Sequence, residues 1–203
     1  MSSQFDGAWS ETALVGIAAQ SGGDMAFQAI TETVDIDIGD KDFDVISTLA
    51  GGRLVKFTPQ EPTTITLEAY PVEAGTDSGT TGLGFFDLIN TTSATQPQDL
   101  DVDRTRSKYR IAIMWTNLTT ATTANEAIGT NNAALRIVAA DGYFTSVKPS
   151  FTDGVLKFTV SYKVPPFDSS GTANVAIQST DIAGATLTAL ASYTSVAKWW
   201  FLF

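Results

Sequence analysis

The chain has 203 residues, of which 43% are apolar and 17% are charged, and its formal net charge is −10. Its length and apolar content suffice for one sizeable hydrophobic core. The sequence contains no histidine and no cysteine, which excludes disulfides, thiolate chemistry, the commonest general base and most zinc sites. The excess of acids argues against electrostatic binding to nucleic acid, because affinity for phosphates requires clustered lysine and arginine.

The N-terminal stretch has neither the basic segment nor the long apolar run of a secretion signal. No run approaches the 18 apolar residues of a membrane helix, so we expect no membrane insertion by this chain. Residues 1–25 are rich in serine, glycine and alanine and predict an irregular N-terminal arm. Residues 26–203 then form a single β domain.

Three extended runs are expected in the first 72 residues of the chain. Over residues 26–38, Ile30, Val34, Ile36 and Ile38 share one parity, as expected for a strand with one buried face. The stretch GDKDFD (39–44) predicts a turn, and VISTLAGG (45–52) leads into another extended run. The clearest strand of this half is TTITLEAYPV (63–72), in which apolar and polar residues alternate.

The middle of the chain combines loops, one short helix and further strands. Residues 75–84 read as a flexible linker, and FFDLINTTS (85–93) predicts a helix of one or two turns. Strands resume over 109–118 and 134–151, with predicted turns at ADG (140–142) and TDG (152–154). Loops near residues 75–110 and 119–132 are long enough to suggest that they have a function of their own.

The last third opens with a predicted hairpin over residues 157–180. Phe158, Val160, Tyr162 and Val164 alternate with polar residues, a double proline follows, and Val175 and Ile177 alternate again. Strands at this spacing with one inserted short helix predict an all-β fold, a β-sandwich or barrel with long loops.

The sequence contains one acidic and one basic group of charged residues. Nine acids and one lysine lie in residues 1–50, and the alternating carboxylates after residue 30 are better explained as an exposed strand face than as an acid–base pair for sugar hydrolysis. Four bases alternate further on, and they form either a solvated strand edge or a stripe that meets acids on a neighbouring copy. These four are Arg104, Arg106, Lys108 and Arg110.

The chain ends in KWWFLF, a cluster of bulky apolar side chains. Left in water, each costs on the order of 1.5–3 kcal/mol relative to burial. Two interpretations remain open: a last strand packed within its own domain, or a plug against a neighbouring subunit. The residues concerned are Trp199, Trp200, Phe201 and Phe203.

Two stretches resemble the tail tube (major tail) proteins of tailed bacterial and archaeal viruses. They are GDKDFDVISTLAGGRLVKFTPQEPTTITLEAYPV (39–72) and VSYKVPPFDSSGTANVAI (160–177). The resemblance implies a structural virion protein of the tail that self-assembles in the host cytoplasm into stacked hexameric rings. It also implies contacts with other tail proteins and transient passage of double-stranded DNA during ejection, without sequence-specific binding. It further implies that a long inter-subunit loop and a chain terminus reach adjacent subunits; by position the loop is 75–110 or 119–132, and the ends are residues 1–25 and 197–203.

A tube needs no active site, so we expect no enzyme activity and no catalytic, cofactor-binding or metal-binding residue. Carboxylates repel phosphate and keep DNA from adhering to a channel wall. The candidates for lining the channel are Asp35, Asp37, Asp40, Asp42 and Asp44. The alternative function is a β-sandwich binding module that recognises a receptor or a carbohydrate. It requires a cluster of exposed aromatic residues, for which Trp9, Trp115 and Tyr143 are the candidates.

Overall fold

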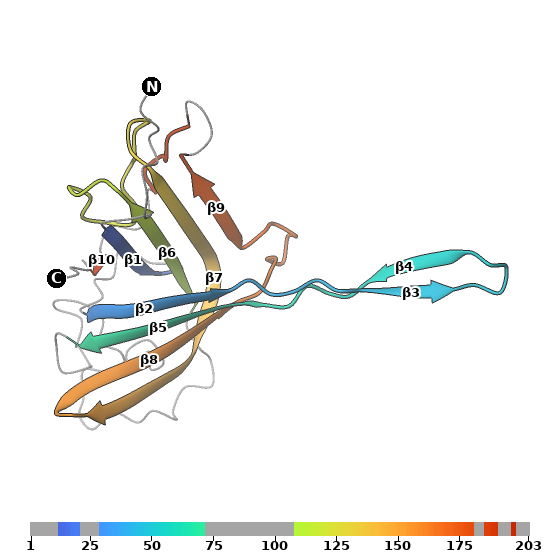
Figure 1. Cartoon of the computed structure of the whole chain (residues 1–203), viewed down its shortest axis with the longest axis horizontal. Helices are drawn as coiled ribbons and strands as arrows, with labels where there is room; N and C mark the ends of the chain where they lie inside the picture. Colours follow the sequence, from blue (N-terminus) through green and yellow to red (C-terminus); the bar gives the residue numbers. More distant parts are fainter. Residues whose placement is uncertain (1–11, 21–28, 72–107, 181–184, 191–195, 198–203) are drawn as a thin grey trace.

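The structure is a computed structural model that describes residues 12–20, 29–71, 108–180, 185–190 and 196–197. The described residues form ten strands and no helix (Figure 1). In that part of the chain nothing helical is long or apolar enough to cross a membrane. The strands are β1 (Thr12–Ala19), β2 (Ala29–Asp37), β3 (Phe43–Ser47), β4 (Arg53–Phe57), β5 (Thr63–Pro71), β6 (Tyr109–Thr116), β7 (Ala134–Thr152), β8 (Val155–Val164), β9 (Val175–Ser179) and β10 (Val196–Ala197).

Eight strands form one antiparallel sheet in the order β10-β1-β6-β7-β8-β5-β2, with β9 also paired to β7. Strand β7 is 19 residues long and belongs to both halves of this sheet. Its first part pairs with β6 and β9, and its second part, from Tyr143 to Thr152, pairs with β8. The two halves run in different directions (Figure 1), so the sheet folds over on itself as a sandwich. The expected all-β fold is confirmed.

The main core lies between the two halves. Alternate residues of β5 and β8 are fully buried against β1 and β6, as expected when one face of a half-sheet covers the other. The predicted parity is confirmed for both strands. The residues that share it are Ile65, Leu67 and Ala69 on β5 and Phe158, Val160, Tyr162 and Val164 on β8.

A second apolar cluster covers the other face of β1 and β6. It joins Leu14, Ala112 and Met114 to Ala121 and Ile128 of the 119–132 loop. Strands β1 and β6 are therefore buried on both faces, which explains why their sequences are continuous apolar runs without alternation. The 119–132 loop packs on its own protomer through this cluster.

Arg136 holds this loop in place from a fully buried position on β7. Its guanidinium donates to the carbonyl of Glu126 at 3.0 Å and to that of Thr188 at 2.5 Å, and its Nε donates to Gln178 at 2.7 Å. Buried polar groups require such partners. Arg136 thus ties two connecting segments to the β1–β6 half.

The structure corrects two predictions in the N-terminal part. The irregular arm over residues 1–25 is wrong for residues 12–19, which form β1 with Val15 and Ile17 in the core. The predicted turn at residues 39–44 is also wrong. There the chain stays paired with residues 58–61, because Thr58 N–H donates to the carbonyl of Asp42 and Glu61 N–H to that of Asp40.

Two further corrections concern β7 and β9. Residues 140–142 do not turn but lie inside β7. Gly142 is needed there because a Cβ would lie 2.4 Å from the Tyr162 ring. The predicted hairpin of β8 with β9 is wrong, since β9 pairs with β7 instead. The TDG turn is confirmed: Asp153 and Gly154 have positive φ angles of 53° and 80° between β7 and β8.

Candidate assembly surfaces

One face of the β2–β5–β8 half is polar and does not contact the core. On β2, Val34 and Ile36 pack toward the core, whereas Asp35 and Asp37 between them are exposed. The alternation continues across the registered strands β5, β8 and β7. We call this surface the polar face; it comprises Thr33, Asp35, Asp37, Thr64, Thr66, Glu68, Lys148, Thr159, Ser161 and Lys163.

An ion-pair cluster lies at one end of the polar face. Lys157 Nζ lies 2.6 Å from a carboxylate oxygen of Glu32 and 2.9 Å from one of Glu68. Tyr70 donates its hydroxyl hydrogen to Glu32 at 3.0 Å. The hydrogen bond from Lys157 is the main cause that lowers the pKa of both glutamates, and the two glutamates raise the pKa of Lys157. Lys157 is therefore neutralised locally.

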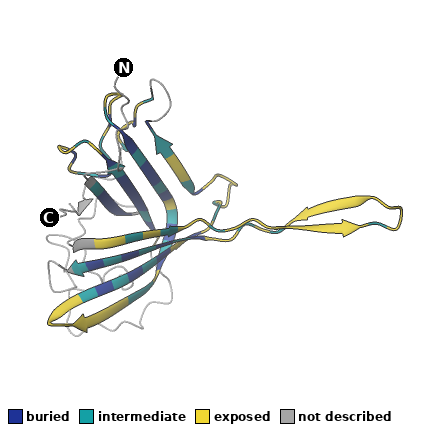
Figure 2. Cartoon of the chain, viewed as in Figure 1, coloured by how far each residue is buried: buried dark blue, intermediate teal, exposed yellow. Residues whose placement is uncertain are grey.

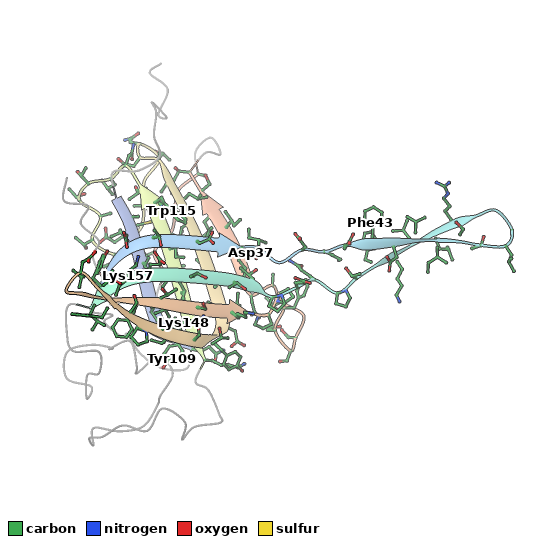
Figure 3. All side chains as sticks on the ribbon, turned by 60° about the horizontal axis from the view of Figure 1, so that its bottom comes forward. Asp37, Phe43, Tyr109, Trp115, Lys148 and Lys157 are labelled. Carbon is green, nitrogen blue, oxygen red and sulfur yellow. The ribbon has the colours of Figure 1, made fainter. Side chains whose placement is uncertain are left out.

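The polar face carries lysines as well as carboxylates. Lys148 and Lys163 are exposed on it, by register opposite Thr159 and Thr64 respectively. Figure 3 shows Lys148 and Lys157 on this half-sheet and Asp37 where β2 ends. With Glu32 and Lys157, the surface holds four acids and three lysines, so its charge is only slightly negative.

The β2–β5–β8 half has two edges that no described strand covers. Strand β2 pairs only with β5, and the second part of β7 pairs only with β8, among the described residues. Edge strands present unpaired N–H and C=O groups that are ready to pair with another strand. Both edges are candidate contacts between copies.

Residues 38–62 project from the sheet as a long hairpin, which we call the arm (Figure 1). Strands β3 and β4 pair over five residues each, and the chain turns over 48–52, where Gly51 has a φ of 79°. At the base of the arm a Cβ on Gly39 would lie 2.1 Å from the Glu61 carbonyl oxygen. Gly39 therefore permits the two backbones to approach closely where the arm begins.

One side of the arm is apolar yet accessible to water (Figure 2). Phe43 lies opposite Phe57, and Val45 lies opposite Val55, so all four side chains point to one side. The two rings make an edge contact at 6.3 Å between centroids, and Phe43 and Phe57 are still 55% and 61% exposed. An isolated two-stranded hairpin is marginally stable in water, so this side calls for a covering partner.

A second exposed apolar group lies at the turn between β7 and β8, residues 151–156, which we call the tip. Phe151 is 73% exposed and Leu156 is 38% exposed. These two residues are register partners and lie on the same side of the sheet as Pro149 and Phe158. The tip thus continues the core-facing side of the sheet beyond the end of the core.

The apolar side of the arm was not predicted from the sequence. A signal was present: Phe-x-Val at 43–45 and Val-x-Phe at 55–57 are mirrored about Ala50, which Gly51 and Gly52 follow directly. Mirrored spacing around a glycine turn is what cross-strand pairing of like side chains produces.

The structure separates the predicted channel-lining residues into two groups. Asp35 and Asp37 are exposed on the polar face, whereas Asp40, Asp42 and Asp44 are exposed on the arm. The two groups are therefore not one cluster.

The predicted basic stripe is only partly described. Lys108 is exposed and forms a 2.9 Å ion pair with Asp141 of its own chain, and Arg110 is half-buried on β6. Arg104 and Arg106 lie outside the described residues, as do the predicted helix at 85–93 and Trp199, Trp200, Phe201 and Phe203.

Of the aromatic residues expected for a binding module, the two that the structure describes are not fully exposed. Trp115 is partly buried against the main core, Tyr143 is half-buried, and Trp9 lies outside the described residues. Within the described ranges, no group of three or more acidic side chains is placed to hold a metal ion.

No protein-family model matches the sequence, and no curated protein matches it. Among solved structures, a chain of the sheath–tube complex of an extracellular contractile injection system (PVC, extended state) is 17% identical, with a TM-score of 0.49 over 86% of this chain and 94% of that chain. A chain of the sheath/tube terminator of the same system is 20% identical, with a TM-score of 0.45 over 83% and 94%. The tube-terminating cap of the anti-feeding prophage is 15% identical, with a TM-score of 0.43 over 88% and 99%.

Proposed function

We propose that this chain is the subunit of a viral tail tube, in which closed rings stack around a hole. The observation that carries the proposal is the four-stranded half-sheet of β2, β5, β8 and the second part of β7, with one polar face and two edges that no described strand covers. All its pairings are antiparallel, so β2 runs opposite to β7. The β7 edge of a second copy can therefore lie beside β2 and continue the antiparallel order.

Pairing of two different edges is a heterologous contact, and such contacts close into rings when the rotation between copies is a whole fraction of a turn. Closure also removes the exposed edges that otherwise favour aggregation. The core covers one face of the half-sheet, so the polar face is the one left to line the hole. The six-fold number of copies and the other tail proteins as partners follow from the sequence resemblance.

The chemistry of the polar face suits a wall along which DNA slides. Asp35 and Asp37 repel phosphate, and Lys157 is held by two glutamates. Lys148 and Lys163 limit the repulsion, so the wall neither binds DNA tightly nor excludes it. Asp40, Asp42 and Asp44 add negative charge wherever the arm lies in the assembly. The role is structural, without catalysis, and its place is the tail of the virion.

Negative-stain electron microscopy of the concentrated purified protein tests this function. We expect rings or hollow tubes; a monodisperse monomer that binds glycans would support the binding module instead. Asp35→Lys tests the lining by changing the charge by two units on the polar face. Assembled Asp35→Lys tubes should retain short DNA fragments at low salt.

The matched control adds the same charge elsewhere. Thr119 and Thr120 are exposed on the loop over the other half of the sheet, and Thr119→Lys/Thr120→Lys also adds two positive charges. These tubes should release DNA as the wild type does. Equal retention by both variants would contradict the proposed lining.

A further inference from the structure

The exposed large apolar side chains of the described residues fall into three groups. The first is on the arm, the second is the tip, and the third is Phe167 with Ile177, in the β8–β9 connection and on β9. The arm group includes the apolar side defined above. A contact between copies that covers this side must use a surface of matching chemistry.

The arm and the tip lie at opposite ends of the same half-sheet (Figure 1). At the arm end, Asp37 pairs with Thr64 and Thr63 pairs with Val164. At the other end, Ala69 pairs with Phe158, beyond which β7 and β8 continue to the tip. The arm points away from its own sheet, so it does not cover the tip of its own chain.

We propose that the apolar side of the arm binds the tip of a second copy, head to tail. This inference rests on the proposed tube function and names the surface by which one ring holds the next. The arm contributes Phe43, Val45, Val55 and Phe57, and the tip contributes the register partners Phe151 and Leu156. Two different surfaces at opposite ends of one molecule form an open contact, which repeats without limit along a filament.

Charge at the two surfaces agrees with this pairing. Arg53 is the register partner of Ser47, two residues beyond Val55 on the apolar side of the arm. Asp153 is exposed in the turn of the tip. A head-to-tail contact can therefore place an arginine beside an aspartate at the rim of the apolar contact, which favours this orientation over its reverse.

The arm is long enough to carry its apolar side beyond the end of its own sheet. From the end of β2 at Asp37 to Phe43 is six residues, or about 20 Å at roughly 3.3 Å per extended residue. The apolar side thus lies well beyond the end of its own sheet. Phe167 and Ile177 do not offer an equivalent partner, because the β8–β9 connection begins after Val164, at the arm end.

Disulfide cross-linking tests the contact directly, because the chain contains no cysteine and only introduced pairs can form. A disulfide requires Cα atoms within about 7 Å. Under mild oxidation, a mixture of Val45→Cys and Leu156→Cys chains should give a dimer on a non-reducing gel. The double variant Val45→Cys/Leu156→Cys should give a ladder of multimers.

Ile46→Cys is the matched control, because Ile46 is exposed on the opposite side of the arm. Mixed with Leu156→Cys, it should give at least tenfold less dimer than Val45→Cys does. Phe151→Asp should shorten the tubes at least tenfold, whereas Phe167→Asp should leave their length unchanged. Circular dichroism checks that both variants keep the wild-type fold.

The outcomes separate this inference from the function on which it rests. Tubes that form without the Val45–Leu156 cross-link would overturn the head-to-tail contact and leave the tube function unaffected. A cross-link from Val45→Cys to the β7 edge would also overturn that contact, because it would place the arm on a lateral neighbour. A cross-link without rings or tubes would support the contact and contradict the tube. If neither the cross-link nor tubes form, both the head-to-tail contact and the tube function are overturned.

Discussion

The double substitution Phe43→Ser/Phe57→Ser should strongly weaken assembly while the protomer stays folded. Each ring is a little over half exposed, and an aromatic side chain offers roughly 200 Å² for burial, so about 100 Å² of each remains in water. Covering that area contributes about 2.5 kcal/mol per ring at about 25 cal/mol per Å², or about 5 kcal/mol for the pair. Within the protomer, the variant loses mainly the edge contact between the rings, worth about 0.5–1.5 kcal/mol.

Urea unfolding and sedimentation velocity measure the two effects separately. We expect the free energy of unfolding to fall by less than about 1.5 kcal/mol. The concentration needed for assembly should rise at least about a hundredfold, since each 1.4 kcal/mol corresponds to tenfold. Asp44→Ser/Lys56→Ser is the control, because this cross-strand pair lies on the opposite side of the arm. Loss of several kcal/mol of protomer stability from the phenylalanine variant, or its normal assembly, would refute the reasoning.

Three further changes test the fold and the polar face. Gly142→Ala should destabilise the protomer by about 1–3 kcal/mol through overpacking against Tyr162, whereas Gly129→Ala, with nothing within 4 Å, should be tolerated; equal urea midpoints would contradict the close contact. Arg136→Met should cost about 2–5 kcal/mol, because buried carbonyls lose their donor, and should speed amide exchange in the 119–132 loop; unchanged exchange would count against the tie. Lys157→Met should raise the pKa of the two glutamates that it binds, as followed by carboxyl NMR. Their lowered pKa in the wild type adds a little stability above about pH 4.5 that is lost as the pH falls through the folded values, and this loss should be smaller in Lys157→Met.

Local alternation predicted which residues of several strands are buried. On β5 and β8 one face meets the core and the other does not, so polar and apolar residues alternate visibly in TTITLEAYP and VLKFTVSYKV. Strand β1 was missed because both of its faces are buried, and TALVGIAA therefore shows no alternation. A strand of this kind is indistinguishable from an apolar stretch of another structure by period alone.

Local sequence patterns did not predict which strands pair or which residues make long-range contacts. The ADG stretch has the composition of a turn, but Gly142 is there to make room for a ring that comes from β8. The double proline after β8 correctly marks the end of that strand, yet nothing local shows that β9 returns to β7. The acidic residues 40, 42 and 44 suggested a turn because the residues that pair with them, 56–61, follow only after the Gly51–Gly52 pair.

The exposed acids of the candidate site were placed in part by parity. Asp35 and Asp37 face away from the core as their alternation with Val34 and Ile36 predicts. Lys148 and Lys163 on the same face were not anticipated, because only the register of β7 and β8 brings them beside the acids.

A cryo-electron microscopy reconstruction of the purified, concentrated protein tests the central claim most directly. We predict a hollow tube of stacked rings in which β2 of each copy pairs with β7 of its neighbour and Asp35 and Asp37 face the hole. Particles without a channel, or a tube with these two aspartates on its outer wall, would contradict it.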